Sequence, residues 1–451
     1  MDRMHPAVAE GSPPEELTLP VVRRPFEGVV RVPGSKSLTN RALVLASMAT
    51  GVSDISNVLL ADDTLVMLEA LKALGHRVEL DEAARTVRVE GSGGDVPHAA
   101  AELMCGNSGT TLRFLAAAVA RGRGRYRFDG IARMRQRPVG GLGQLLQNLG
   151  VRVSYEQQPG FPPMWVDADR LPGGTLLFGT AESSQFLSAV LMVAPFARHE
   201  VRVNLTGPQT SWPYVAMTMR LMDHFGHYAE LERDEDTGEP TRIVVPRGIY
   251  RAGPYVVEPD ASNASYFLAA AAVNPGSRVR LDGLGGTSLQ GDIAAATLLE
   301  SMGAAVELAD DHITLTGPER LDGITADLSG TPDLAQTLAV VAAFARSPST
   351  FTGLHTLRVK ETDRIAALQT ELTRLGCAVA VSEDRGVSLT VVPPPGGVHR
   401  PAAIDTYDDH RMAMAFAVAA TRIDGLVIRN PMCCAKTYPG FFDDLRALLR
   451  G

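Results

Sequence analysis

Two kinds of predicted helix alternate along the chain. Six segments combine a polar first turn with a run of small apolar residues, which predicts helices that are buried on every side. They begin near Asn40 (NRALVLASMA), Thr110 (TTLRFLAAAVA), Ser183 (SSQFLSAVLMVA), Asn263 (NASYFLAAAAV), Asp333 (DLAQTLAVVAAFA) and Asp409 (DHRMAMAFAVAA), at intervals of 70 to 80 residues. The regular spacing indicates six repeated units.

An amphipathic helix follows each buried one. In the first five units its Leu-, Met- or Phe-rich turns end at a glycine, which tolerates a left-handed helix cap, and a strand pattern comes next. These segments are LEALKALGHRVEL, LGQLLQNLGVRVSY, MRLMDHFGHYAEL, ATLLESMGAAVEL and LQTELTRLGCAVAV, and the sixth unit ends in FFDDLRALLR. For 451 residues we therefore expect six α/β units in two domains of three units each.

Composition narrows the classes of function. The chain is 45% hydrophobic and 21% charged, and its formal net charge of -8 argues against a general nucleic-acid or membrane-surface binder. No apolar run approaches the ~20 residues that a membrane-spanning helix needs. The first 20 residues are rich in Pro and Glu and lack the apolar stretch of a signal peptide, so we expect a loose tail on a cytoplasmic protein. Four cysteines without a C-x-x-C pair, and histidines without ligand spacing, predict no metal site.

Lysine is rare, and its positions are informative. Of the 43 basic residues only four are lysines. Lys36, Lys360 and Lys436 lie in polar motifs, whereas Lys72 lies in a helical stretch and is expected to face solvent. A lysine ammonium is a compact, titratable charge, while arginine is a planar fork. The three lysines in motifs therefore indicate sites that arginine would serve less well.

Polar and cationic residues gather where the buried helices begin. In VPGSKSLTNR, Lys36, Ser37 and Arg41 surround a helix start, where free backbone N–H groups and the helix dipole favour an anion. Taken alone, these residues fit two interpretations equally well. They could form an anion-binding site, or Ser37 could be an ordinary helix cap and Lys36 a solvated charge. Similar clusters occur in CGNSGTTLRF (105–114), MRQRPVGGL (134–142), ESSQFL (182–187), RVKETDRIAAL (358–368), YDDHRMAMAF (407–416) and CCAKTYPGFF (433–442). Their recurrence at equivalent places favours an anion-binding site.

Common nucleotide-binding loops do not fit the sequence. A P-loop needs G-x-x-x-x-G-K-[ST], but Lys36 follows a serine, and GLGGTSLQG (283–291) lacks the G-x-G-x-x-G spacing. Of the ten histidines, only His410, between Asp409 and Arg411, is favoured as a site residue. The anion site must therefore be of another kind.

The motifs, taken in order, resemble those of one enzyme family. P-G-S-K-S-x-x-N-R, G-N-S-G-T, R-P-x-G, S-S-Q-F, R-V-K-E-T-D-R, D-H-R-M-A-M and A-K-T occur between about Val32 and the C-terminus. In these motifs the chain resembles the EPSP synthases, the 3-phosphoshikimate 1-carboxyvinyltransferases of the shikimate pathway. The resemblance implies a two-domain inside-out α/β barrel, with three βαβαββ units in each domain and the active site in the cleft between them. It also implies a discontinuous first domain (1–34 and 258–451), a second domain (35–257), and hinges near Gly34 and Glu258.

The resemblance further implies a reaction and its binding residues. The enolpyruvyl group of phosphoenolpyruvate would pass to the 5-hydroxyl of shikimate 3-phosphate with release of phosphate, in a monomer and without a cofactor or metal. Two such anions side by side call for many cations and few compensating carboxylates. The positions matched to shikimate 3-phosphate are Lys36, Ser37, Arg41, Ser183, Ser184, Gln185, Ser211, Tyr214, Asp333, Thr356 and Lys360. Those matched to phosphoenolpyruvate are Lys36, Asn107, Gly109, Arg137, Gln185, Arg364, His410, Arg411 and Lys436.

Three of these positions are expected to be catalytic. By resemblance, Asp333 removes the proton of the 5-hydroxyl, Glu361 takes part in protonating the methylene carbon, and Lys36 contacts both anions. The two carboxylates lie among cations, which should keep them ionised. The resemblance also implies that glyphosate competes for the phosphoenolpyruvate site, whose wall includes Gly109.

Two positions depart from the family pattern. Thr356 stands where the family often has an Asn that contacts the substrate phosphate, and Phe114 follows Arg113 where many members have Pro. The first change weakens one hydrogen bond of the site that the resemblance implies, and the second alters the wall beside phosphoenolpyruvate. Neither changes a charge.

Two alternatives share the fold but differ in their chemistry. The sister enolpyruvyl transferase that acts on UDP-N-acetylglucosamine carries a reactive Cys near the Arg137 position and a Lys-Asn pair. Residues 129–139 of this chain contain no Cys, and GSKS replaces that pair. A non-catalytic anion-binding protein would not need Asp333 or Glu361, and the chain has both.

Overall fold

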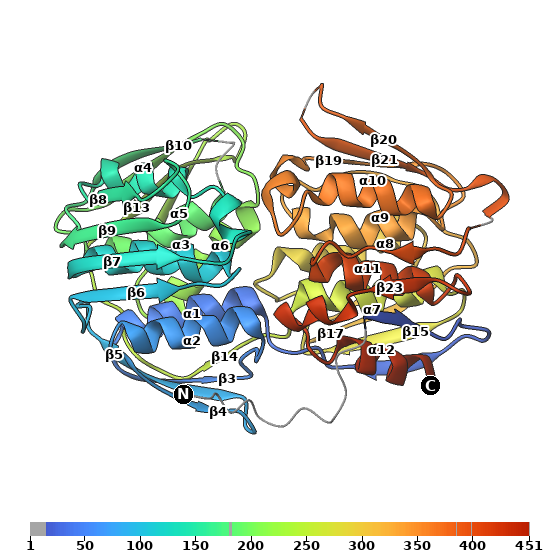
Figure 1. The fold of residues 1–451 in the computed structure, drawn as a ribbon, viewed down its shortest axis with the longest axis horizontal. Coiled ribbons are helices and arrows are strands. Elements are labelled where there is room, and N and C mark those ends of the chain that lie inside the picture. The colour runs from blue at the N-terminus through green and yellow to red at the C-terminus, as the bar shows by residue number, and fades with distance from the viewer. Residues whose placement is uncertain (1–14, 180–182, 385, 398, 451) are drawn as a thin grey trace.

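Two lobes lie side by side, and the chain passes from one to the other and back (Figure 1). The structure is a computed structural model that describes residues 15–179, 183–384, 386–397 and 399–450. We call the segment from α1 (Lys36–Met48) to β14 (Tyr255–Val256) the middle lobe and the rest of the described chain the terminal lobe. Each lobe is built around its own cluster of buried hydrophobic side chains.

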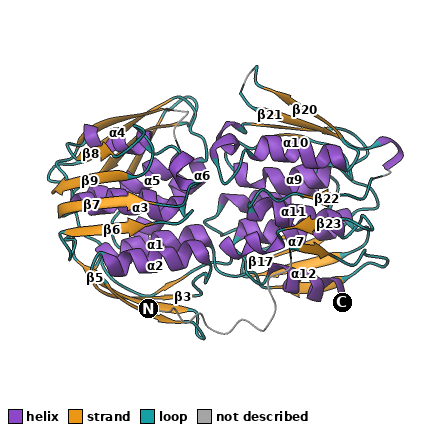
Figure 2. Ribbon diagram, in the orientation of Figure 1, coloured by secondary structure: helices purple, strands orange, loops and turns teal. Residues whose placement is uncertain are grey.

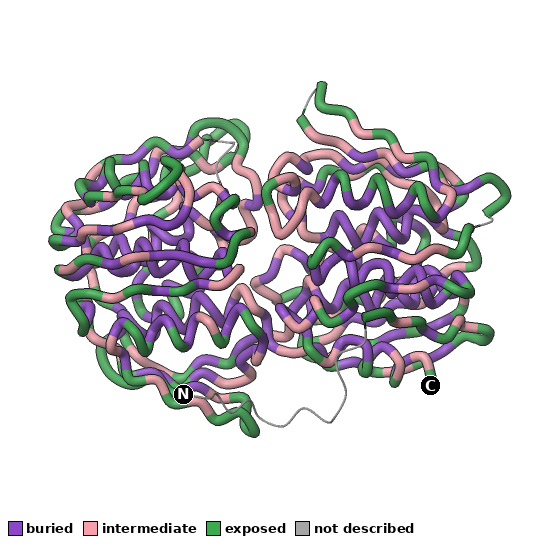
Figure 3. Tube along the Cα trace, in the orientation of Figure 1, coloured by how far each residue is buried: buried purple, intermediate pink, exposed green. Residues whose placement is uncertain are grey.

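The six predicted buried helices are all present. They are α1, α3 (Gly109–Ala118), α5 (Ser184–Val193), α7 (Ala261–Val273), α9 (Ala335–Ala342) and α11 (His410–Ala420). Their alanine-rich runs favour the helix intrinsically, and the absence of charge beyond the first turn permits burial on all sides. In α3 every residue is buried. Figure 3 shows these buried segments inside each lobe, with the exposed segments at the periphery.

The six amphipathic helices are also present, with their predicted caps. They are α2 (Asp62–Ala73), α4 (Gly140–Asn148), α6 (Trp212–His224), α8 (Ala294–Ser301), α10 (Arg364–Arg374) and α12 (Phe441–Arg450). The glycines expected to end the first five have positive φ, namely Gly75, Gly150, Gly226, Gly303 and Gly376. The left-handed caps predicted from the sequence are therefore confirmed.

Six small sheets occur in the described residues, one for each repeated unit. In the middle lobe their strands are β3 (Thr50–Ser56), β4 (Arg77–Asp81), β5 (Thr86–Ser92), β6 (Ala100–Met104), β7 (Arg123–Asp129), β8 (Arg152–Tyr155), β9 (Met164–Asp169), β10 (Gly174–Gly179), β11 (Val201–Thr206), β12 (Glu230–Arg233), β13 (Pro240–Val245) and β14. The sheet orders are β14-β3-β5-β4, β6-β7-β9-β8 and β10-β11-β13-β12. In each sheet the first pair is parallel and the other two are antiparallel.

Two sheets of the terminal lobe repeat this topology, and the third has three strands with one parallel and one antiparallel pair. Its strands are β1 (Glu16–Thr18), β2 (Glu27–Val30), β15 (Arg278–Asp282), β16 (Ala305–Leu308), β17 (His312–Thr316), β18 (Thr325–Asp327), β19 (Ser349–Thr352), β20 (Ala378–Ser382), β21 (Ser388–Val392), β22 (Ala403–Ile404) and β23 (Val427–Arg429). The sheet orders are β16-β17-β15-β2, β18-β19-β21-β20 and β1-β23-β22. Figure 2 shows strands around the outside of the lobes and helices nearer their interior. The predicted α/β class is confirmed.

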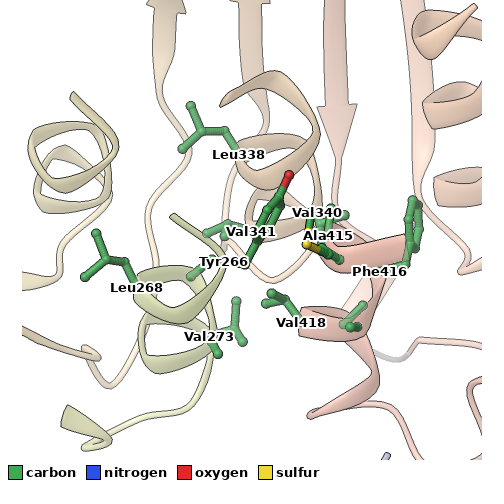
Figure 4. Packing of buried hydrophobic residues seen from close by; sticks show 14 of the residues in the cluster. Tyr266, Leu268, Val273, Leu338, Val340, Val341, Ala415, Phe416 and Val418 are labelled. Carbon is green, nitrogen blue, oxygen red and sulfur yellow. The ribbon is translucent and has the colours of Figure 1, made fainter. Parts of the chain in front are cut away.

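The core of the terminal lobe forms where three buried helices meet. Tyr266 and Leu268 from α7, Val341 from α9, and Phe416 and Val418 from α11 belong to one buried cluster (Figure 4). Small alanines between these larger side chains let the three helices approach closely, so the starts of the helices are held in fixed positions relative to one another. None of the helices in the described part of the chain has the length and apolar character that a membrane crossing requires.

The first 20 residues do not form a loose tail throughout. Residues 1–14 lie outside the described residues, but β1 pairs antiparallel with β23, with Leu17 opposite Ile428. Leu17 packs against the core of the terminal lobe, and Leu19 is buried in it. The expectation was wrong for residues 15–20, because the short ELTLP segment places alternate leucines on one face of a strand.

The two crossings between the lobes are hydrogen-bonded to each other. The amide of Ser35 donates to the carbonyl of Glu258 over 2.8 Å, and the amide of Asp260 donates to the carbonyl of Pro33 over 2.8 Å. A side chain at Gly34 would place its Cβ 1.9 Å from the carbonyl oxygen of Asn57, so glycine alone fits this crossing. The chain thus leaves and re-enters the terminal lobe at one point.

Candidate active site

A pocket lined by both lobes contains nearly all of the residues predicted from the motifs. From the middle lobe these are Lys36, Ser37, Arg41, Gly109, Arg137, Ser183, Ser184, Gln185, Ser211 and Tyr214, and from the terminal lobe Asp333, Thr356, Lys360, Glu361, Arg364, His410 and Arg411. The two remaining residues, Asn107 and Lys436, lie directly behind its wall. The carbonyl of Asn107 accepts hydrogen bonds from Arg137 and from the Lys436 ammonium, each over 2.9 Å.

In the middle lobe, serines cap the buried helices that reach the pocket. The side chains of Ser35, Ser108 and Ser183 accept hydrogen bonds from backbone amides in the first turns of α1, α3 and α5. Ser37 therefore lines the pocket without serving as the cap. Because a serine cap carries no charge, the positive ends of the α3 and α5 dipoles remain available to an anion, whereas the first amide of α1 already donates to a carboxylate of the other lobe.

Aspartates occupy the equivalent places in the terminal lobe. Asp260 caps α7 and Asp409 caps α11, while Asp333 lies in the short 3-10 helix Pro332–Leu334 that leads into α9. Asp260 also accepts a hydrogen bond from the amide of Lys36 over 3.0 Å. These carboxylates place negative charge at helix starts, where the dipole stabilises it.

Asp333 is surrounded by three cations. Its carboxylate accepts hydrogen bonds from Arg411 over 2.7 Å and from Arg364 over 3.1 Å, and the Lys360 ammonium lies 4.0 Å away. Burial alone would raise the pKa of Asp333, but Arg411, Lys360 and Arg364 together lower it below its ordinary value. The carboxylate is therefore ionised at neutral pH, as its neighbours in the sequence predict.

Glu361 is held in a similar way. Its carboxylate lies 2.8 Å from Arg364 and 3.8 Å from the Lys436 ammonium. Burial opposes ionisation, but Arg364, Arg137 and Lys436 lower the pKa of Glu361 well below its ordinary value. Arg364 thus contacts both candidate catalytic carboxylates, and its Nε also donates to Asp409 over 2.7 Å.

The expectation of few compensating carboxylates was wrong. Asp63, at the start of α2, lies 3.3 Å from the Lys36 ammonium and 2.9 Å from that of Lys436, and so joins lysines from the two lobes. Asp292 and Asp409 also contribute buried carboxylates. This role of Asp63 was not predicted, since an aspartate in the first turn of a helix is an ordinary feature.

Arg41 is deeply buried, and all three nitrogens of its guanidinium donate hydrogen bonds. It donates to Thr218 over 2.7 Å and to Ser188 over 3.2 Å, and its guanidinium carbon lies 5.0 Å from the centre of the Phe114 ring. Burial lowers the pKa of Arg41 to about 10, which still leaves it charged at neutral pH. We expected Phe114 to form part of the pocket wall, but it is not among the residues that line the pocket. Its ring instead makes a cation–π contact with Arg41, which does line the pocket.

Tyr214 reaches across the pocket to the terminal lobe. Its hydroxyl donates to both carboxylate oxygens of Asp292, over 3.2 and 3.1 Å, and the hydroxyl of Ser262 donates to the same carboxylate. Burial, with the nearby charge of Asp333, raises the pKa of Asp292 to about 6. The sequence placed Tyr214 at the site but did not identify this partner, which lies in the opposite lobe.

Six pocket residues of the described chain have buried polar atoms without hydrogen-bond partners, and His410 and Thr356 are the two of them that belong to the predicted site and are not arginines. Neither ring nitrogen of His410 is hydrogen-bonded, and the hydroxyl of Thr356 has no partner. Burial and the charge of Lys36 lower the pKa of His410 well below its ordinary value, so the ring is neutral. A neutral imidazole offers one donor and one acceptor, and both side chains are therefore available to a ligand in the pocket.

Arg113, in the CGNSGTTLRF motif, was not predicted as a site residue, but it lines the pocket. It donates to the side-chain oxygen of Gln185 and lies over the Phe186 ring, 5.3 Å from its centre. In the described residues no group of three or more His, Cys, Asp or Glu side chains is arranged to hold a metal ion. The pocket is thus a cleft of buried cations and carboxylates, suited to polyanionic ligands and to proton transfer.

Comparison with known proteins gives a consistent result. The family model described as EPSP synthase (3-phosphoshikimate 1-carboxyvinyltransferase) matches residues 22–445. A 3-phosphoshikimate 1-carboxyvinyltransferase from Nostoc punctiforme is 43% identical over 429 residues, covering 95% of this chain and 98% of the relative. A chloroplastic 3-phosphoshikimate 1-carboxyvinyltransferase from Brassica napus is 42% identical over 461 residues, covering 98% of this chain and 87% of the relative.

Solved structures agree with the fold. An EPSP synthase from Acinetobacter baumannii superposes with a TM-score of 0.77 at 24% identity, covering 96% of this chain and 98% of that one. The enolpyruvyl transferase NikO from Streptomyces tendae gives a TM-score of 0.74 at 21% identity, covering 97% and 98%. At these identities the likeness concerns the fold.

Proposed function

The chain belongs to the EPSP synthase family, and we propose that its cleft transfers the enolpyruvyl group of phosphoenolpyruvate to the 5-hydroxyl of shikimate 3-phosphate, releasing phosphate. The observation that carries this proposal is Asp333, an ionised carboxylate fixed by Arg411, Arg364 and Lys360 in a pocket that both lobes line. Such a group is placed to accept a proton from a hydroxyl that is held beside a second anion.

We further propose that the chain adopts a two-domain inside-out α/β barrel, with three βαβαββ units in each domain. We assign residues 35–257 to one domain and residues 1–34 and 258–451 to the other, with the paired crossings at Gly34 and Glu258 as hinges. Two separate hydrophobic clusters, and the hydrogen bonds that join the crossings, support this division. We also propose that the protein acts as a monomer, because residues of one chain line the whole pocket.

Substrate binding in the proposal follows the charges of the site. Shikimate 3-phosphate would lie against the serine-capped helix starts of the middle lobe, with the 5-hydroxyl directed towards Asp333. The residues assigned to it are Lys36, Ser37, Arg41, Ser183, Ser184, Gln185, Ser211, Tyr214, Asp333, Thr356 and Lys360. Phosphoenolpyruvate would be held by Lys36, Asn107, Gly109, Arg137, Gln185, Arg364, His410, Arg411 and Lys436. Glyphosate would compete for this second set.

Proton transfer depends on what the substrates do to the cations. Arg364, Arg411 and Lys436 now compensate Asp333 and Glu361. When the anions of phosphoenolpyruvate engage these cations, each carboxylate loses part of its compensation and its proton affinity rises. Both groups then come closer to the range in which they can exchange protons during the reaction.

The proposed chemistry balances as an addition followed by an elimination. The 5-hydroxyl oxygen bonds to the central carbon of phosphoenolpyruvate and gives its proton to Asp333, while Glu361, in its protonated form, gives a proton to the methylene carbon. In the elimination the bond between the central carbon and the phosphate oxygen breaks, Glu361 takes a proton back from the methyl carbon to restore the double bond, and phosphate leaves with the proton held by Asp333. Lys36 is positioned to balance charge on both anions through the addition.

A phosphate-release assay with phosphoenolpyruvate and shikimate 3-phosphate tests the proposal. We expect release only when both substrates are present, and the loss of release in Asp333→Asn. Release with UDP-N-acetylglucosamine in place of shikimate 3-phosphate would instead identify the sister transferase. Binding of both anions without any release would indicate a non-catalytic anion-binding protein.

A further inference from the structure

Arg133 of the middle lobe reaches the backbone of the terminal lobe. It directly precedes the short 3-10 helix Met134–Gln136, and its side chain is half-buried. Its guanidinium donates to the carbonyl of Lys360 over 2.7 Å and to the carbonyl of Glu361 over 2.9 Å. Its remaining nitrogen donates to the side chain of Gln136 over 3.1 Å. One planar fork therefore holds two consecutive carbonyl groups of the opposite lobe.

The two carbonyls belong to a segment that no helix or strand fixes. Lys360 and Glu361 lie between the 3-10 helix His355–Val359 and α10. Their side chains face Asp333 and Arg364, with the Lys360 ammonium 4.0 Å from Asp333. Because a side chain follows the direction of its own backbone, holding both carbonyls also fixes where the ammonium and the carboxylate point.

The neighbouring arginines of the same motif have different partners. Arg135 forms two hydrogen bonds with Asp129 of its own lobe, over 2.9 and 2.7 Å. Arg137 lines the pocket and donates to Asn107, which is also in its own lobe. Of the three arginines in RMRQR, Arg133 is thus the one whose hydrogen bonds, as far as the described residues show them, cross between lobes.

Three basic side chains of the terminal lobe that line the pocket are almost fully covered. Arg364, His410 and Arg411 are 2%, 1% and 6% exposed, and separation of the lobes would uncover them. Opening of the cleft would break the contacts of Arg133, and closure would restore them. The Arg133 contact therefore forms when closure brings the pocket residues of the two lobes together.

We propose that Arg133 is a positioning residue that couples closure of the cleft to the alignment of Lys360 and Glu361. This inference rests on the proposed function, because it assigns a role in that reaction. Without Arg133 the lobes still fold and the anions still bind, but the segment that carries Lys360 and Glu361 is free to move when the cleft closes. Misplacement of reacting groups by about 1 Å can cost roughly a hundredfold in rate.

The test compares Arg133→Met, Arg133→Lys and a matched control, Arg123→Met. Arg123 lies in β7 of the same lobe, and its charge meets Asp169 at the surface over 3.4 Å. We expect kcat to fall by about ten- to a hundredfold in Arg133→Met, with a smaller change in KM and an unchanged Tm of the free protein. Arg133→Lys should recover part of kcat, since one ammonium reaches one carbonyl. Arg123→Met should match the wild type.

Small-angle scattering with and without shikimate 3-phosphate supplies a second readout. Compaction of the wild type and the control, but less compaction of Arg133→Met, is expected. If kcat and compaction of Arg133→Met equal those of the control, or if its Tm falls together with its activity, the positioning role is wrong while the proposed function stands. If the wild type itself neither compacts nor releases phosphate, the proposed function fails and this inference fails with it.

Discussion

The two walls of the cleft are built from equivalent helices but carry different charges. On the middle-lobe side, Ser35, Ser108 and Ser183 cap the buried helices, and Asp63 is the carboxylate that lines this wall in the described residues. On the terminal-lobe side, carboxylates occupy or neighbour every equivalent helix start. They are Asp260, Asp292, Asp333, Glu361 and Asp409.

This difference separates two tasks within one repeated fold. Uncharged caps leave the dipoles of α3 and α5 free to attract anions, and the cations of the middle lobe add to that field. In the terminal lobe the cations are paired with carboxylates, so this wall can hold and move protons as well as bind charge. We therefore propose that the middle-lobe wall mainly binds anions and that the terminal-lobe wall transfers protons.

The largest effect should come from the proton-transfer wall. We expect Asp333→Asn to lower kcat by about 10²- to 10⁴-fold, the usual contribution of a positioned acid or base, while shikimate 3-phosphate still binds. Asp327→Asn, which changes an exposed aspartate in β18, is the control. Steady-state kinetics with a calorimetric binding titration would check both points. A comparable loss of binding in Asp333→Asn would contradict the division between the walls.

The next effect tests the charge that faces both walls. Lys36→Met should cost at least ~3 kcal/mol of transition-state stabilisation, because it removes a half-buried cation that would lie between the two bound anions. Lys72→Met should change almost nothing, since that ammonium meets Glu69 at the surface. The measurement is kcat/KM for both substrates. A value within about tenfold of the wild type would contradict the role of Lys36.

A smaller effect is expected on the anion-binding wall at Gly109. A Cβ there would lie 2.8 Å from Nη2 of Arg137 and 3.1 Å from Nη1 of Arg113, so Gly109→Ala displaces the cations that would hold phosphoenolpyruvate. We expect a raised KM for phosphoenolpyruvate, kcat within about tenfold of the wild type, and a larger loss of affinity for glyphosate, the longer ligand.

Inhibition titrations of the wild type and the variant against phosphoenolpyruvate measure this effect. Gly253→Ala is the matched control, because nothing lies within 4 Å of the Cβ that it would add. Equal inhibition constants for the wild type and Gly109→Ala would show that Gly109 does not shape the ligand site.

The smallest effect concerns how Asp292, on the terminal-lobe wall, changes the stability of the protein with pH. The pKa of Asp292 is raised to about 6 in the folded protein, so between about pH 4 and pH 6 the folded state holds a proton that the unfolded state has lost. Stability from this group therefore falls as the pH rises through that window. Relative to the wild type, Asp292→Asn should gain on the order of 1 kcal/mol between pH 4.5 and pH 7. Thermal unfolding at the two pH values would measure it, and an identical difference at both would contradict the raised pKa.

The sequence predicted what depends on local pattern. The apolar run of NRALVLASMA and the Gly75 cap are encoded within a few residues, and the structure confirms both. Partners from the other lobe carry no such local signal. Asp63 is an ordinary first-turn acid in the sequence, and its partner Lys436 lies 373 positions away. Arg133 directly precedes the MRQRPVGGL motif, and its partners Lys360 and Glu361 lie in the other lobe.

Strand β1 was missed for the same reason. Three residues of alternating pattern are too few to predict a strand, and the partner strand β23 lies at the far end of the chain. The side chains of Glu16 and Arg429, which join the two strands, are 413 positions apart. A single sequence therefore predicts the repeated units better than it predicts which units meet.

That long-range pairing affects how the protein can be synthesised. Strand β2 emerges from the ribosome before the middle lobe, yet its partner β15 is made only after the middle lobe is complete. At about 5–20 residues per second the wait is on the order of tens of seconds. The middle lobe should thus acquire protease resistance on nascent chains that extend past Glu258, while β1 and β2 remain cleavable until β15 and β23 emerge. During synthesis a folded middle lobe is therefore connected, through the paired crossings, to a terminal lobe that has not yet folded.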